Sequence, residues 1–272
     1  MDEWRQRFLD ASPMFEPLRG VGSALAELER WPTLDEYNAL LHPPILGASG
    51  TEIGFVPQAG KPAHMEDKYE SRIYLAGEVQ TRTENWHDLF NALVWLAFPR
   101  TKAAINARHF ASITESRGEG NRDKTQDALT LFDESGVVVL YSDGDLASLL
   151  QEHQWQELFW ARRQSVNACM KFVIFGHSLY EKALKPYIGI TGKGLLIRVE
   201  DAFFSQTPET QLEIADGLMA AFFSRKGQIS SRDLSPVPLL GVPGWWPENV
   251  DALFYSNTRY FRPPGGRDVL TL

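Results

Sequence analysis

One stretch decides how this chain folds: Trp86-His87-Asp88-Leu89-Phe90-Asn91-Ala92-Leu93-Val94-Trp95-Leu96-Ala97-Phe98-Pro99. From Leu89 to Phe98 its only polar residue is Asn91, so as a helix it would be apolar on nearly every side and therefore buried. Its first half nevertheless carries His87, Asp88 and Asn91, and residues three or four apart lie on one side of a helix. Because an unpaired buried polar group costs about 1–3 kcal/mol, these side chains must have partners elsewhere in the chain.

The residues just before this stretch have the form of a helix start. Thr81 and Glu84 are spaced as in a capping box, in which each side chain accepts a hydrogen bond from a backbone N–H at the start of the helix. Pro99 marks the other end, because proline ends or kinks a helix. We therefore predict a central buried helix over about 82–98, followed by a second helix over about 100–113.

The other segments predict an α+β fold that is mainly helical and has short strands. A β-hairpin is expected over about 128–141, because two β-prone runs are joined by Asp133-Glu134-Ser135-Gly136, a sequence typical of turns. Residues 154–185 keep the spacing of a long helix, although Phe172 to Gly176 have the composition of a strand. Further helices are predicted over 24–31, 34–41 and 208–223, and further strands over 52–56, 69–80 and 195–199.

We expect one domain over residues 1–272, on which residues 1–44 pack as a helical N-terminal segment. The chain is 43% hydrophobic and 12% aromatic, which is enough for a sizeable core and excludes intrinsic disorder for most of its length. Residues 235–247 are rich in Pro, Gly and Trp, so we expect an irregular segment that wraps around this core.

Composition also limits the partners and the location of the protein. The net charge of -8, from 27 Lys+Arg and 35 Asp+Glu, argues against a nucleic-acid or membrane partner. The single cysteine, Cys169, rules out an internal disulfide and fits a reducing compartment. No secretory signal is visible, and the apolar runs fall short of the roughly 18 residues of a membrane span. We expect a cytoplasmic protein; its oligomeric state is not indicated.

Four residues are candidate ligands of one divalent metal, zinc or a similar ion: His87, Asp88, His177 and Glu181. Imidazole nitrogens and carboxylate oxygens are common zinc ligands, and His177 and Glu181 lie one turn apart if their segment is helical. His87, Asp88 and His177 would also carry the catalysis. Each residue has a structural alternative. Asp88 suits a helix N-terminus, a buried histidine can bond a backbone carbonyl, and Glu181 can orient an imidazole or pair with a lysine.

Other polar residues are candidates for binding a substrate. Asn91 and His109 would hydrogen-bond it, and Arg72, Arg82 or Lys193 would neutralise an anionic group. The alternative for these side chains is a solvated surface with ordinary salt bridges, each of which contributes little.

No nucleotide cofactor is expected. The segment Gly189-Ile190-Thr191-Gly192-Lys193-Gly194 offers backbone amides and a lysine, but it has neither the spacing of a Walker A loop nor that of a dinucleotide-binding turn. The chain also lacks a Cys-pair zinc motif, a Gly-x-Ser-x-Gly elbow and a His-Glu-x-x-His helix, so the families that carry these motifs lose support.

Three blocks of the sequence resemble a bacterial family known as domain of unknown function DUF3025. The blocks are Tyr69-Glu70-Ser71-Arg72-Ile73-Tyr74 leading into Asn85-Trp86-His87-Asp88-Leu89-Phe90-Asn91-Ala92-Leu93, then Asp127-Ala128-Leu129-Thr130-Leu131-Phe132-Asp133-Glu134, then Phe175-Gly176-His177-Ser178-Leu179-Tyr180-Glu181-Lys182. The resemblance covers about residues 30–265. It implies a bacterial, cytosolic, single-domain protein and assigns no catalytic role to any residue.

The residues themselves favour an enzyme, a metal-assisted hydrolase of a small polar or phosphorylated substrate. A bound metal would lower the pKa of a water molecule to about 7 and so supply a nucleophile. One alternative is a metal-free protein that binds or transfers an anionic metabolite. Another is a non-enzymatic protein-interaction module, whose surface would include the aromatic pairs Trp245-Trp246, Phe254-Tyr255 and Tyr260-Phe261.

Overall fold

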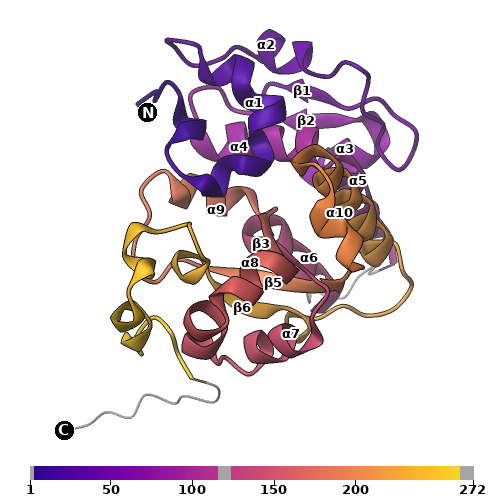
Figure 1. Cartoon of the computed structure of the whole chain (residues 1–272). Coiled ribbons are helices and arrows are strands. Elements are labelled where there is room, and N and C mark those ends of the chain that lie inside the picture. Colours follow the sequence, from indigo (N-terminus) through magenta and orange to yellow (C-terminus); the bar gives the residue numbers. More distant parts are fainter. Residues whose placement is uncertain (1–2, 116–123, 264–272) are drawn as a thin grey trace, which may run out of the picture.

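The protein folds into helices packed around small sheets, which confirms the predicted α+β class (Figure 1). The computed structural model describes residues 3–115 and 124–263. The elements of the first half are α1 (Arg19–Ala26), α2 (Leu34–Ala39), β1 (Gly54–Val56), α3 (Tyr69–Ala76), β2 (Glu78–Gln80), α4 (Trp86–Ala97), α5 (Pro99–Glu115), α6 (Lys124–Ser135) and β3 (Gly136–Tyr141). Those of the second half are α7 (Gly144–Gln151), a π-helical turn (Glu157–Ala161), α8 (Arg163–Cys169), β4 (Met170–Ile174), α9 (His177–Ala183), β5 (Thr191–Arg198), α10 (Pro208–Phe223) and β6 (Ser235–Pro238).

The main sheet has four strands in the order β4-β3-β5-β6. The central strand β3 is antiparallel to β4, with Val137 opposite Ile174, and parallel to β5, with Val137 opposite Gly194. Residues 137–140 of β3 are fully buried, as expected for a strand covered on both faces. A separate two-stranded parallel sheet pairs β1 with β2.

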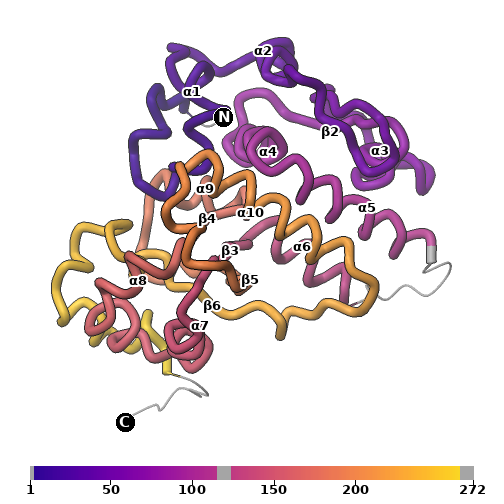
Figure 2. Tube along the Cα trace, turned by 45° about the vertical axis from the view of Figure 1, so that its right-hand side comes forward, coloured from indigo at the N-terminus to yellow at the C-terminus, as the bar shows by residue number. Residues whose placement is uncertain are grey.

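Helix α5 packs against both α10 and α6, and the three helices lie close together in both views (Figures 1 and 2). The N-terminus of α5 is capped by a residue of another helix. The buried carboxylate of Asp216 on α10 accepts hydrogen bonds from the backbone N–H groups of Arg100 and Thr101, and from the hydroxyl of Thr101. These bonds satisfy donors that a helix cannot pair internally.

The central helix is buried as predicted, but it begins at Trp86 instead of residue 82. Its N-cap is Asn85, whose side chain accepts the backbone N–H of Asp88. Thr81 instead donates to the carbonyl of Val79 and belongs to the turn after β2, and Glu84 has a φ of 56°. The predicted capping box at Thr81 is therefore wrong, because a stronger cap lies four residues later.

The segment 69–80, predicted as one strand, is mostly the helix α3. Gly77 ends this helix in the left-handed conformation, with a φ of 72°, which is the usual role of glycine at a helix C-terminus. A Cβ at this position would lie 1.9 Å from the carbonyl oxygen of Glu52. Only the last three residues, 78–80, form a strand.

The predicted hairpin over 128–141 is also wrong in its first half. Residues 124–135 form α6, which buries Thr125, Ala128, Leu129 and Phe132 at helical spacing. Only the second run, from Gly136, is a strand. A short apolar run such as 128–132 fits a strand and a buried helix equally well, and its contacts with neighbouring elements decided for the helix. The loop predicted at 116–121 lies outside the described residues.

The long helix predicted over 154–185 is instead a π-helical turn, α8, β4 and α9 in succession. Here the β-prone composition of residues 172–175 outweighed the helical spacing. The glycine-rich segment 189–194 is largely the start of β5. A Cβ at Gly192 would lie 2.4 Å from the side chain of Val137. The absence of a side chain at Gly192 therefore leaves room for the side chain of Val137. Residues 235–238 likewise form the edge strand β6 before the chain becomes irregular.

Both ends of the described chain pack into the core. In the N-terminal segment, Trp4 stacks on Trp86 with ring centroids 5.2 Å apart. Near the C-terminal end, Tyr255, Tyr260 and Phe261 are buried, and the other aromatic residues proposed as a partner surface are half-buried against the core. The interaction-module hypothesis thereby loses the exposed aromatic surface on which it was based. Within residues 3–115 and 124–263, no helix has both the length and the apolar composition to span a membrane.

We predict that Asp216→Ala lowers the free energy of unfolding by about 2 kcal/mol, because two backbone N–H groups at the start of α5 lose their acceptor, whereas the hydroxyl of Thr101 keeps the backbone carbonyl of residue 216. The measurement is urea unfolding of the purified variant. Glu213→Ala on the same helix is the matched control, since its ion pair with Arg100 is exposed and is worth less than about 1 kcal/mol. Equal losses in the two variants would contradict the capping role.

Candidate metal centre

Three helix ends meet at one place in the molecule. His87 lies in the first turn of α4, Glu134 in the last turn of α6, and His177 is the first residue of α9. The antiparallel pairing of β3 with β4 brings the last two together, since α6 runs directly into β3 and β4 is followed closely by α9. Glu134 and His177, which are 43 positions apart in the sequence, thus become neighbours because of the register between β3 and β4.

Gly176 allows the two chain segments to approach closely. Its N–H donates to the carbonyl of Gly136 at 2.9 Å, and the N–H of Phe175 donates to the same oxygen. A Cβ on Gly176 would lie 2.5 Å from the backbone nitrogens of Ser135 and Gly136. Any other residue at this position would force α9 away from the end of α6.

Aromatic packing fixes the third helix. Phe90 of α4 stacks on Tyr180 of α9, with ring centroids 5.7 Å apart, and Phe15 stacks on both rings. Phe90 follows His87 by three residues, and Tyr180 follows His177 by three. The stacked rings therefore hold the starts of the two helices, and with them the two histidines, against one another.

The facing atoms of the three side chains form a compact triangle. His87 Nε2 and His177 Nε2 are 3.1 Å apart, and Oε1 of Glu134 lies 3.6 Å from His177 Nε2 and 3.9 Å from His87 Nε2. The circle through the corners of a triangle with these sides has a radius of about 2.1 Å. Ligands of zinc lie about 2.0–2.2 Å from the metal when they are imidazole nitrogens or carboxylate oxygens. The three residues are spaced such that they could hold a metal ion.

The second nitrogen of each imidazole faces a carboxylate. Nδ1 of His87 lies 3.4 Å from Oε2 of Glu181, and Nδ1 of His177 lies 3.8 Å from Oδ2 of Asp133. The His177 Nδ1 is buried and has no hydrogen-bond partner within the described part of the chain. A carboxylate on this side favours the tautomer that carries its proton on Nδ1 and leaves the Nε2 lone pair free. Ser178 in turn donates a hydrogen bond to Glu134.

A buried lysine neutralises Asp133. Lys102 of α5 is 4% exposed, and its ammonium group lies 2.6 Å from Oδ1 of Asp133 and 2.9 Å from Oδ1 of Asn91. Burial by itself would raise the pKa of the Asp133 carboxyl, but Lys102 and then His177 outweigh it and lower the pKa. Burial would likewise raise the pKa of Glu134, but the hydrogen bond and charge of His177, with Ser178 and His87, lower it to about 2. Both carboxylates therefore remain ionised beside the histidines.

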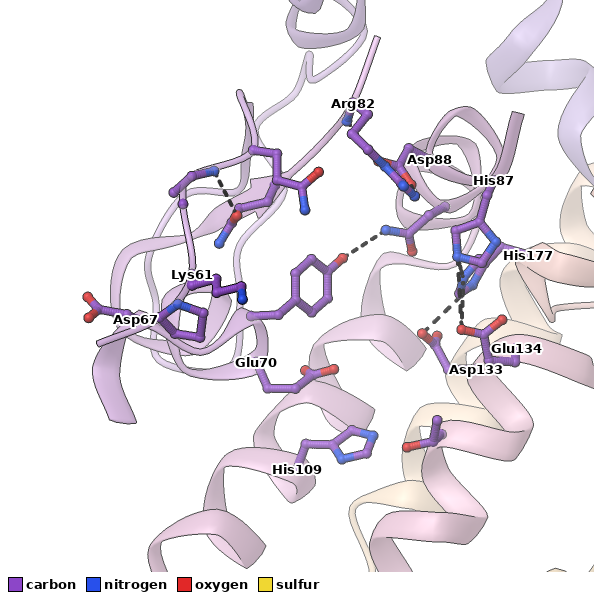
Figure 3. A pocket seen from close by; sticks show the side chains of 18 residues that line it. Lys61, Asp67, Glu70, Arg82, His87, Asp88, His109, Asp133, Glu134 and His177 are labelled. Atoms are coloured by element: carbon purple, nitrogen blue, oxygen red, sulfur yellow. Dashed lines mark hydrogen bonds and ion pairs between the residues drawn. The ribbon is translucent and has the colours of Figure 1, made fainter. Parts of the chain in front are cut away.

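The triangle opens into a pocket of about 620 Å3 (Figure 3). Figure 3 shows His87 and His177 meeting next to Asp133 and Glu134, with the Arg82–Asp88 pair on one side and His109 apart from them. Most of the lining is polar, and it comes from the segment 58–70, from β2 and from helices α4, α5, α6 and α9. The polar and charged side chains among the lining residues are Gln58, Lys61, Asp67, Tyr69, Glu70, Gln80, Arg82, His87, Asp88, Asn91, His109, Thr130, Asp133, Glu134 and His177.

Two of the four predicted metal ligands play other roles. Asp88 turns away from the triangle because it lies 100° around the helix from His87, and its carboxylate accepts three hydrogen bonds from Arg82. Glu181 does lie one turn after His177 on α9, but it faces Nδ1 of His87. It is therefore placed to orient an imidazole, and the carboxylate that faces Nε2 of both histidines is that of Glu134.

The predicted substrate-binding residues divide into two groups. Asn91, Arg82 and His109 line the pocket, and the imidazole of His109 is 93% buried with no hydrogen bond to any described residue. Arg72 instead pairs with Glu78, and Lys193 lies within β5, outside the pocket lining. Neither of these two cations is available to a ligand there.

Glu134 and Asp133 were not among the candidate site residues, because both were assigned to a turn. The spacing of Thr125, Ala128 and Phe132 is helical and was the available signal: a helix ending at residue 135 would have placed two carboxylates at one helix end. Tyr69 was missed for the same reason, since its segment was predicted as a strand.

Comparison with known families and proteins gives one match. Residues 53–265 match the family described as a protein of unknown function, DUF3025, and this range contains every residue of the triangle. No curated protein and no solved structure is similar enough to the chain to count as a match.

We predict that Lys102→Met, studied with a chelator present, lowers the free energy of unfolding at neutral pH by about 3 kcal/mol, because Asp133 becomes an unpaired buried charge. The loss should shrink in acid. Since the folded pKa of Asp133 is lowered, its stabilising effect is complete above the unfolded value of about 3.9 and disappears as the pH falls through the folded value.

Urea unfolding of both proteins at about pH 7 and about pH 3 measures this difference. Lys171→Met is the control, because its pair with Glu16 is partly exposed and should cost less than about 1 kcal/mol at either pH. If Lys102→Met lowers the free energy of unfolding by the same amount at both pH values, the result would contradict the ion pair between Lys102 and Asp133.

Proposed function

The chain belongs to the DUF3025 family of proteins of unknown function, so its activity has to be inferred from its own residues, and we propose that it is a metal-dependent hydrolase of a small polar substrate. In this proposal His87, His177 and Glu134 bind one divalent metal, zinc or a similar ion. Two histidines and one glutamate are the protein ligands of several catalytic zinc sites, in which a water molecule takes the fourth position.

One observation carries the proposal: the nitrogen and oxygen atoms that face one another are spaced for a metal, while the outer nitrogens of both histidines face carboxylates. Carboxylates in that position raise the basicity of a metal-bound imidazole and hold its orientation.

The proposed site can supply a nucleophile at neutral pH. A water molecule on the metal would ionise with a pKa of about 7, and its oxygen could attack a substrate held in the adjoining pocket. Asn91 and His109 line that pocket and could hydrogen-bond the substrate. Glu181 and Asp133 would stabilise the positive charge that spreads to the imidazoles when the metal binds.

Metal binding itself is the test. We predict that the wild-type protein binds one zinc ion per chain in isothermal titration calorimetry, and that His87→Ala, His177→Ala and Glu134→Gln each weaken binding at least about 100-fold. His42→Ala, which removes an exposed histidine outside the pocket, should bind as the wild type does. Binding should also weaken as the pH is lowered, because protons compete for the imidazoles.

A parallel titration with Fe(II) under anaerobic conditions identifies the metal, since two histidines and a carboxylate also bind iron in oxygenases. If an added anionic ligand stabilises the protein even when a chelator is present, the protein binds anions without a metal. Folded wild-type protein that binds neither metal, or ligand variants that bind as the wild type does, would refute the proposal.

A further inference from the structure

A chain of hydrogen bonds leads from the candidate metal centre to Tyr69. The ammonium group of Lys102, which also pairs with Asp133, donates to Oδ1 of Asn91 at 2.9 Å. The amide nitrogen of the same asparagine donates to the hydroxyl oxygen of Tyr69 at 2.8 Å. Asn91 and Lys102 are both more than nine-tenths buried, whereas Tyr69 is 37% exposed, so the chain runs from the interior to the accessible end at Tyr69.

The direction of every bond in this chain is fixed. A lysine ammonium group has no acceptor, so the atom of Asn91 that faces Lys102 must be the oxygen, and the atom that faces Tyr69 must be the NH2 group. Tyr69 therefore accepts from Asn91, and its own hydroxyl proton is left for another partner. No described residue accepts a hydrogen bond from this hydroxyl, and Tyr69 lines the pocket. Desolvation and the charge of Glu70 raise the pKa of Tyr69, although the residue as a whole is 37% exposed, so the proton is retained.

Apart from the exposed Lys61, the lysine and arginine side chains near the pocket are already paired. Arg82 is bound to Asp88, Lys102 to Asp133, and Arg72, outside the lining, to Glu78. Asp67 and Glu70 add two further carboxylates to the lining, against the exposed Lys61. Enzymes that act on phosphate esters use several cations to hold the dianionic group. The charges around this pocket are arranged for a substrate that is neutral when it binds.

We propose that the substrate is a carboxylic ester or amide, and that Tyr69 donates its hydroxyl proton in a hydrogen bond to the carbonyl oxygen of that substrate. This inference rests on the proposed metal-dependent hydrolysis. His87, His177 and Glu134 would hold the metal, which would supply an activated water molecule as the nucleophile. When the water oxygen bonds to the carbonyl carbon, an electron pair of the C=O bond would move to the carbonyl oxygen, where Tyr69 would stabilise the negative charge. That pair would return as the bond from carbon to the ester oxygen or amide nitrogen breaks. One proton of the water would pass to the leaving atom and the other to solvent or to the amine, so the products would be a carboxylate and an alcohol or a protonated amine.

The experiment uses the cobalt(II)-loaded full chain, because the visible spectrum of cobalt reports both its own binding and that of an added ligand. The probes are acetohydroxamate, which presents a carbonyl oxygen to the metal, and inorganic phosphate. The variants are Tyr69→Phe and, as the matched control, Tyr74→Phe on the same helix, whose ring stacks on Phe110 and does not line the pocket.

We expect acetohydroxamate to bind the wild type and Tyr74→Phe equally, and Tyr69→Phe about tenfold or more weakly, because a hydrogen bond to a charged ligand is lost. Cobalt should bind all three proteins equally, which shows that the fold and the metal centre are intact. Phosphate should bind more weakly than acetohydroxamate.

Equal acetohydroxamate affinity in Tyr69→Phe and Tyr74→Phe would overturn the role of Tyr69. Tighter binding of phosphate than of acetohydroxamate would overturn the substrate class. The absence of any cobalt spectrum in the wild type would instead overturn the proposed metal-dependent function, so the two failures can be told apart.

Discussion

The close contact of Gly176 with the backbone of residues 134–136 is the constraint on which the candidate site depends. It allows β4 to end and α9 to begin directly beside the point where α6 becomes β3. The stacking of Phe90 on Tyr180 then adds the start of α4. Because a rigid sheet and a packed aromatic core set these positions, the site is built on well-supported elements, as a preorganised centre requires.

The polar side chains around the pocket fall into two sets. In the first set, a carboxylate is bound by an arginine or a lysine, as Asp88 is by Arg82 and Asp133 by Lys102. The second set has no such partner and consists of the facing imidazoles of His87 and His177, the carboxylate of Glu134 and the hydroxyl of Tyr69. A buried ion pair such as Lys102–Asp133 adds little to stability by itself, because desolvation offsets the attraction. Its value here is to orient the groups around it.

Local signals in the sequence predicted the elements whose ends are determined locally. Helix α2 begins at the capping box of Thr33 and Glu36, and α10 occupies the predicted range after the N-cap Thr207. The predictions were wrong where a short apolar run is compatible with both a helix and a strand, as in α6 and β4. There, packing against neighbouring elements determines which of the two forms. For the site, His87 and His177 could be selected by residue chemistry alone. Glu134 could not be assigned to them, because only the register of β3 and β4 places it there.

We propose that two imidazoles and one carboxylate from three helix ends share a metal ion. Anomalous diffraction from crystals grown with zinc, recorded on both sides of the zinc absorption edge, tests this directly. We expect one strong peak within about 2.0–2.2 Å of Nε2 of His87, Nε2 of His177 and a carboxylate oxygen of Glu134. A map without a peak there, in which the two histidines keep their direct 3.1 Å contact, would contradict it.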